Sequence, residues 1–199
     1  MGISHNDDQV SIEPISKETG LVRRSEFLTE RVRQLARQVR ELGLTEGSVR
    51  QNACAHYRRG MSRYDSSQYS QAIQDFSEAA RLDPKWASAH YFVGLSHYHL
   101  NQYEQALQDF GNAVRLDLKF ASAYLTKAMS HHLLGQYGQA IKDFSTVIKL
   151  NPKWASAYYG RGRAHQRLGN YKEAGSDLQA AGKLGFPLAG SHYLPYISQ

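Results

Sequence analysis

One short segment occurs twice in this chain almost unchanged. It reads Asp83-Pro84-Lys85-Trp86-Ala87-Ser88-Ala89 at its first occurrence and Asn151-Pro152-Lys153-Trp154-Ala155-Ser156-Ala157 at its second. The two copies lie two periods of 34 residues apart, and the same period links three further columns of identical residues. The columns are Tyr69, Tyr103, Tyr137 and Tyr171; Ala72, Ala106, Ala140 and Ala174; and Asp75, Asp109, Asp143 and Asp177. A constant period of this length indicates stacked units, each too small to bury a core alone.

Each unit carries two apolar stripes at helical spacing. In the unit that follows Trp86, an i, i+4, i+7 stripe is followed by a second stripe of the same kind. The stripes are His90, Gly94 and His97, then Ala106, Phe110 and Ala113. Gly or polar residues between the stripes predict a turn, and Pro84 and Pro152 follow the second helix, where a missing amide hydrogen costs no interior bond. The sequence therefore predicts helix–turn–helix units and an all-α fold.

This combination resembles the tetratricopeptide repeat over residues 53–188. Small residues at the eighth position of each unit face the alanine column, where the two helices approach most closely: Gly60, Gly94, Ala128 and Gly162. Two departures are local: His56 and His90 replace the family's aromatic residue at position four, and Leu118 and Phe186 replace the terminal proline. The resemblance implies a right-handed α-solenoid of four helix-turn-helix repeats (53–86, 87–120, 121–154 and 155–188), with an N-terminal helix and a short C-terminal tail.

The N-terminal flank divides into two segments. Residues 1–23 are polar with no apolar period, so we expect a disordered lead. Residues 24–47 are expected to hold an amphipathic helix, whose apolar positions step by 4, 3, 4 and 3. These positions are Leu28, Val32, Leu35, Val39 and Leu42. We expect this helix to cap the first repeat; the alternative is a dimerising or partner-binding helix.

The second helix of the fourth repeat has few large apolar side chains to contribute to the core. Gly175 and Gly182 stand in the fourth repeat where earlier second helices have larger side chains. The tail, residues 189–199, continues an apolar stretch that is broken by Pro187 and Pro195. We expect this tail to fold back over the last helix, and an exposed tail would instead be an association surface.

Charge and cysteine content limit the class of protein. The net charge is +6, and residues 121–199 carry all of the excess, with nine basic residues against three acidic ones. The single Cys54 excludes an intramolecular disulfide and a zinc site built from several thiolates. The sequence contains no apolar run of about 20 residues and no signal peptide, so we expect a cytoplasmic protein without a membrane span.

Residues suited to catalysis or metal binding are present, but not in a productive pattern. No phosphate loop, nucleophile elbow, dinucleotide fingerprint or zinc-protease motif occurs. His97, His131 and His165 repeat every 34 residues, which places them too far apart to share a metal. The aspartate column is expected to form a solvated or salt-bridging face on the outer helices. We therefore expect no enzyme activity, cofactor or metal.

The concave surface is the predicted binding site. In proteins with this repeat, positions 2, 5, 9, 12 and 13 of each first helix line the groove. The candidate partner-binding residues are Tyr57, Met61, Tyr64, Tyr91, Leu95, Tyr98, His99, Leu125, Met129, His132, Tyr159, Arg163 and Arg167. They suit a peptide with apolar residues and an acidic end facing Arg163 and Arg167. Alternatively, some of the tyrosines belong to the core between repeats, in which case replacing Tyr91 and Tyr98 would unfold the protein instead of weakening binding alone.

The sequence predicts a non-catalytic scaffold or adaptor that binds a peptide or helical segment of another protein. The members of the family that grip acidic chaperone tails have Lys and Asn where this chain has Tyr57 and Met61, so that role is disfavoured. The alternative function is nucleic-acid binding by the basic C-terminal half. A third interpretation is self-association through the 25–43 helix or the C-terminal tail.

Overall fold

The computed structural model describes residues 27–35, 37–38 and 45–187. The chain divides into two units, Met1–Ser48 and Val49–Gln199. The lead at 1–23 and the tail at 189–199 lie outside the described residues, so the expectations for them stay predictions. Within the described ranges the secondary structure is helical and contains no strand.

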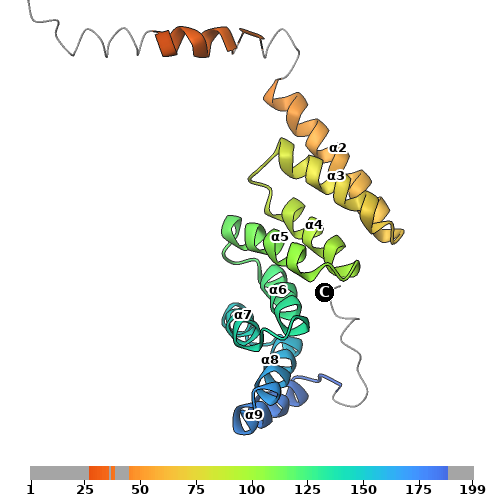
Figure 1. The fold of residues 1–199 in the computed structure, drawn as a ribbon, viewed down its shortest axis with the longest axis vertical. Coiled ribbons are helices and arrows are strands. Elements are labelled where there is room, and N and C mark those ends of the chain that lie inside the picture. Colours follow the sequence, from red (N-terminus) through yellow and green to blue (C-terminus); the bar gives the residue numbers. More distant parts are fainter. Residues whose placement is uncertain (1–26, 36, 39–44, 188–199) are drawn as a thin grey trace, which may run out of the picture. The chain divides into compact units, whose positions relative to one another are not determined.

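Eight helices form the repeat array, and each adjacent helix packs against the next (Figure 1). The first helices of the repeats are α2 (Glu46–Asp65), α4 (Ala87–His99), α6 (Ala121–Leu133) and α8 (Ala155–Arg167). The second helices are α3 (Tyr69–Leu82), α5 (Tyr103–Leu116), α7 (Tyr137–Leu150) and α9 (Tyr171–Lys183). Because α4, α6 and α8 also contact the second helix of the preceding repeat, the pairs stack into the predicted all-α solenoid.

The turn between the two helices of each repeat requires a left-handed backbone. Gly135 and Gly169 adopt φ values of 72° and 77° there, which glycine accepts without strain. Ser67 and Asn101 occupy the same place in the first two repeats with φ of 58° and 59°. This shared conformation explains why the sequence has Gly, Asn or Ser at this point in every repeat.

In the first two repeats, the two helices meet at a glycine and a phenylalanine. A Cβ added to Gly60 would lie 2.8 Å from the Phe76 ring, and one added to Gly94 would lie 2.7 Å from the Phe110 ring. Both rings are fully buried. The predicted close approach at the eighth position is therefore confirmed for these two repeats, but the glycines meet the phenylalanine rings instead of the alanine column.

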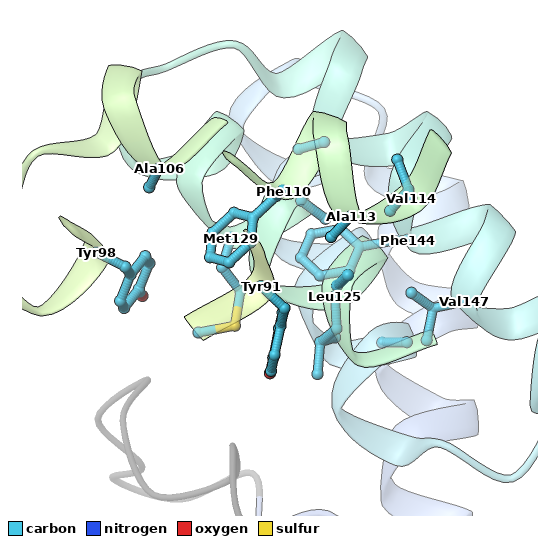
Figure 2. Close-up of a cluster of buried hydrophobic side chains, with 14 of the residues drawn as sticks. Tyr91, Tyr98, Ala106, Phe110, Ala113, Val114, Leu125, Met129, Phe144 and Val147 are labelled. Atoms are coloured by element: carbon cyan, nitrogen blue, oxygen red, sulfur yellow. The ribbon is translucent and has the colours of Figure 1, made fainter. Parts of the chain in front are cut away.

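The hydrophobic core runs between the repeats. Phe110 and Phe144 from the second helices meet Leu125 and Met129 from the intervening first helix (Figure 2). A smaller cluster around Phe76 joins the first repeat to Phe92 of the second, with ring centroids 5.2 Å apart. Burying one such large side chain contributes about 1.5–3 kcal/mol, so the array is stabilised mainly by these repeated contacts.

The aspartate column is not the solvated face that the sequence suggested. Asp75, Asp143 and Asp177 are buried between the two helices of their repeats, each against a cation from the first helix. The shortest ion-pair distances are 2.5 Å for Arg59–Asp75, 2.6 Å for Arg63–Asp75, 3.1 Å for Lys127–Asp143 and 2.7 Å for Arg161–Asp177. Ion pairing was predicted correctly and solvation was not, because these side chains point toward the first helix rather than outward.

The described part of the N-terminal unit is helical and exposes its apolar side chains. Phe27, Leu28, Val32 and Leu35 are exposed in this segment, and the cap that this helix is expected to form on the first repeat stays a prediction. Glu30 pairs within the same segment with Arg33 at 3.4 Å and Arg37 at 2.9 Å. No described helix is both long enough and apolar enough to cross a membrane.

Candidate functional site

The thirteen candidate residues fall into two groups by burial. Five are buried in the core: Tyr91, Leu95, Tyr98, Leu125 and Met129. Six are half-buried: Tyr57, Met61, Tyr64, His99, His132 and Tyr159. Arg163 and Arg167 are exposed. The structure thus leaves accessible residues at the two ends of the predicted groove and buries its middle.

The buried group contributes to the packing between repeats. Tyr91 is 5% exposed, and its ring centroid lies 4.7 Å from that of Phe120 and 5.8 Å from that of Phe110. Tyr91, Leu125 and Met129 lie together in the same cluster as Phe110 and Phe144 (Figure 2). The expectation that Tyr91 and Tyr98 can be removed at little cost in stability therefore does not fit their burial.

The tyrosine at the fifth position holds the loop that ends its own repeat. The Tyr57 ring stacks on Trp86 at 4.5 Å, and Tyr159 stacks on Phe186 at the same distance. Tyr91 and Phe120 form the corresponding pair in the second repeat. Sequence reasoning missed these pairs, although the aromatic residue that ends each of the first three repeats, and Phe186 near the end of the fourth, was the available signal.

An aromatic patch lies between the first two repeats; we define it as Met61, Tyr64, Tyr69 and His99. The Tyr64 hydroxyl and His99 Nε2 share a hydrogen bond of 2.8 Å, and the Tyr69 ring stacks on the His99 ring at 4.6 Å. Burial lowers the pKa of His99 below its usual value and raises the pKa of Tyr64 to about 12. The patch is therefore uncharged at neutral pH.

A basic patch lies at the other end; we define it as His132, Tyr137, Arg163 and Arg167. The Arg167 guanidinium lies over the Tyr137 ring, 5.3 Å from its centroid. The His132 ring packs edge-on against Tyr137 at 5.1 Å. Burial, with the charges of Arg163 and Arg167, lowers the pKa of His132, so the positive charge here comes from the two arginines.

Two open hollows occur at equivalent loops of the array. One is lined by Cys54, Lys85 and Ser88, and the other by Lys153, Ser156 and Phe186 together with their neighbours. Among the described residues, no group of three or more His, Cys, Asp or Glu side chains is placed to hold a metal ion. The arrangement suits contact with a polypeptide along the array better than enclosure of a small molecule.

Models of one family match most of the repeat region. A model described as "Tetratricopeptide repeat" matches residues 57–124, a second of that description matches 155–184, and one described as "TPR repeat" matches 130–169. No curated protein sequence matches the chain.

Solved structures share this fold. A crystal structure of MamA is 22% identical, with a TM-score of 0.66, and the match covers 74% of this chain and 92% of that one. YrrB, described as a TPR protein with an unusual peptide-binding site, is 25% identical with a TM-score of 0.63, over 79% of this chain and 81% of that one. The first TPR of Spaghetti (RPAP3), solved with the HSP90 peptide SRMEEVD, is 22% identical with a TM-score of 0.59, over 60% and 95% of the two chains.

Proposed function

Because the chain belongs to the tetratricopeptide repeat family, we propose that it is a non-catalytic interaction scaffold that binds a peptide segment of a partner protein along its first helices. Two structures of similar fold are described by their peptide binding, YrrB and the RPAP3 repeat domain. The expected cytoplasmic location stays a prediction.

The observation that carries the proposal is the separation of the accessible candidates into an uncharged aromatic patch and a basic patch. Both patches lie on or beside the first helices, and the buried residues between them keep α4, α6 and α8 packed in a continuous row. A peptide that spans the row would therefore meet different chemistry at its two ends. This difference favours one orientation of the bound peptide, with one end at the aromatic patch and the other at the basic patch.

The aromatic patch is suited to apolar side chains of the peptide. Tyr64 and His99 already restrain one another through their hydrogen bond, so binding costs little side-chain entropy there. Met61 is half-buried and flexible, and it adapts to ligands of varied shape.

The basic patch is suited to a carboxylate of the peptide. Tyr137 holds the Arg167 guanidinium in place, and Arg163 is exposed beside Gln166, with 3.3 Å between Arg163 Nη1 and Gln166 Oε1. Arginine binds carboxylates with paired hydrogen bonds, so we propose an acidic residue at this end of the partner segment. At the first repeat, Tyr57 and Met61 offer no charge to such a residue, which supports the single direction.

The test is a nuclease-treated affinity capture with the immobilised full chain, followed by identification and peptide mapping of the retained proteins. The Arg163→Glu/Arg167→Glu variant should lose the specific partner. The Lys142→Glu/Lys149→Glu variant makes the same charge change at two exposed sites on α7 and should retain it.

Equal retention by both variants would remove the basic patch from the proposal. Capture that disappears with nuclease treatment, and whose affinity falls steeply between about 50 and 200 mM salt, would favour nucleic-acid binding instead.

A further inference from the structure

The basic patch gathers three side chains that can carry positive charge around one tyrosine. Arg163 and Arg167 lie one turn apart on α8 and are exposed, and His132 of α6 is half-buried. The Arg167 guanidinium lies 5.3 Å from the centroid of the Tyr137 ring, and the centroid of the His132 ring lies 5.1 Å from the same point. Among the described residues, neither arginine forms an ion pair, and the Arg163 guanidinium donates to the neutral Gln166.

The buried carboxylates of the helices packed against α6 are paired with other groups. Asp143 of α7 lies 3.1 Å from Lys127 and 3.6 Å from His131, and Asp109 of α5 lies 3.8 Å from His97 of α4. The charges that act on the imidazole of the basic patch are those of its two arginines, and together with burial, the larger cause, they hold its pKa below the usual value.

Two exposed arginines one helical turn apart are suited to an anion. A guanidinium binds a carboxylate with paired hydrogen bonds. The bound carboxylate would cancel part of the positive field at His132, so the imidazole would hold its proton up to a higher pH than in the free protein. Because linkage between two sites is reciprocal, a proton on His132 must then strengthen binding of the carboxylate by the same factor.

We propose that the basic patch takes up a proton on His132 when it binds the acidic residue of the partner, so that binding tightens as the pH falls from about 7 to about 5. This coupling rests on the proposed function, since it concerns the same end of the partner segment. His132 acts through its charge and not by contact with the ligand. The patch then holds the partner more tightly in an acidified medium than at neutral pH.

Sulfate is the probe, because its charge does not change over this pH range. Nuclear magnetic resonance of the imidazole groups of the full chain follows the titration, and the signal of His132 is identified by its loss in His132→Gln. Sulfate should raise the pKa of His132 relative to chloride at equal ionic strength. Sulfate should also bind at least about threefold more tightly at about pH 5.5 than at about pH 8.

Two double variants separate the patch from general charge. Arg163→Gln/Arg167→Gln should raise the pKa of His132 in chloride, because two like charges are removed, and should abolish the response to sulfate. Lys142→Gln/Lys149→Gln removes the same charge from exposed sites on α7 and should behave like the wild type. Circular dichroism of each variant checks that the repeat array stays folded.

A pKa of His132 that is the same in sulfate and in chloride would overturn the proposal. A response to sulfate that survives the loss of both arginines would also overturn it. The capture experiment fails independently of this one: if charge reversal at Arg163 and Arg167 releases the partner while His132 does not respond to sulfate, the proposed function stands and the proton coupling does not.

Discussion

At the scale of single residues, Asp109 differs from the other members of its column because the position that holds Arg59, Lys127 or Arg161 in their repeats holds Val93 in its own. Among the described residues, its ionic partner is His97, whose Nε2 lies 3.8 Å from the carboxylate. Burial raises the pKa of Asp109 to about 6, and the charge of His97 only partly opposes that shift. The carboxylate is therefore a destabilising group at neutral pH.

Asp109→Asn should stabilise the protein at pH 8 by about 1–2 kcal/mol. The folded pKa lies above the unfolded value, so the folded state holds the proton more tightly and the contribution of Asp109 to stability falls as pH rises from about 4 to 6. The gain from asparagine should thus be present at pH 8 and small at pH 4. Urea unfolding at the two pH values measures it, and an equal effect at both would contradict the pKa explanation.

Asp75→Asn is the matched control with the opposite sign. Burial alone would raise the pKa of Asp75, but hydrogen bonds and charges from Arg59 and Arg63 hold it below its usual value. Its stabilising contribution is present above the unfolded pKa and is lost as the pH falls through the folded one. Replacing it should therefore destabilise the protein at pH 8.

Tyr91→Ala tests where the fifth-position tyrosines act. Truncating a large buried aromatic side chain costs about 3–5 kcal/mol, since the surrounding rings of Phe110 and Phe120 cannot fill the cavity. We expect a clear fall in the midpoint of urea unfolding. Arg163→Ala is the comparison, because truncating that exposed side chain should change the free energy of unfolding by less than about 0.5 kcal/mol. If the Tyr91 variant were as stable as the wild type, the side chain would not contribute to the core and would belong to the accessible surface.

At the scale of helices, the period predicted which elements form and where they approach. The eighth-position column identified Gly60 and Gly94 as contact points, because identical environments recur every 34 residues. Gly160 was not identified, since the sixth position holds Phe92, Thr126 and Gly160 in successive repeats. Gly160 differs from the residues at its position in the other repeats, so its close contact can be recognised only when its neighbour in the preceding repeat, Phe144, is known.

Gly160→Ala and Gly175→Ala should therefore have opposite effects on α8 and α9. A Cβ at Gly160 would lie 2.3 Å from Phe144 Cζ, so the ring must move and the loss should reach about 1–3 kcal/mol. A Cβ at Gly175 meets no atom within 4 Å, and alanine should stabilise the helix by about 0.5–1 kcal/mol. Thermal unfolding of the two single variants compares them, and a common sign would show that helix propensity outweighs packing at Gly160.

At the scale of the molecule, the solenoid was predictable and the distribution of accessible groove residues was not. The period determines how units stack, but burial of Tyr91 or Leu125 depends on which neighbours converge on each side chain, such as Phe120 and Trp154 from the repeat ends. The thirteen candidate partner-binding residues predicted from the groove positions therefore include both core residues and surface residues. The exposed arginines of the last repeat were recognisable because charged side chains are rarely buried without a partner.

An array of this kind gains stability from contacts between neighbouring repeats, so its end repeats should open first. The core cluster draws its buried members from α4 to α8, whereas α9 buries only Ala174, Asp177 and Ala181 and leaves Tyr171 73% exposed. Hydrogen exchange should accordingly be fastest, among the second helices, in α9 and slower in α5 and α7. Gly175→Ala should slow exchange in α9 by about threefold and leave α5 unchanged, since its gain of about 0.5–1 kcal/mol is local. Mass spectrometry of peptic fragments resolves these helices. If all of them exchanged at one rate, and the variant slowed them equally, the repeats would open as a single cooperative unit and the weak end would have no separate stability.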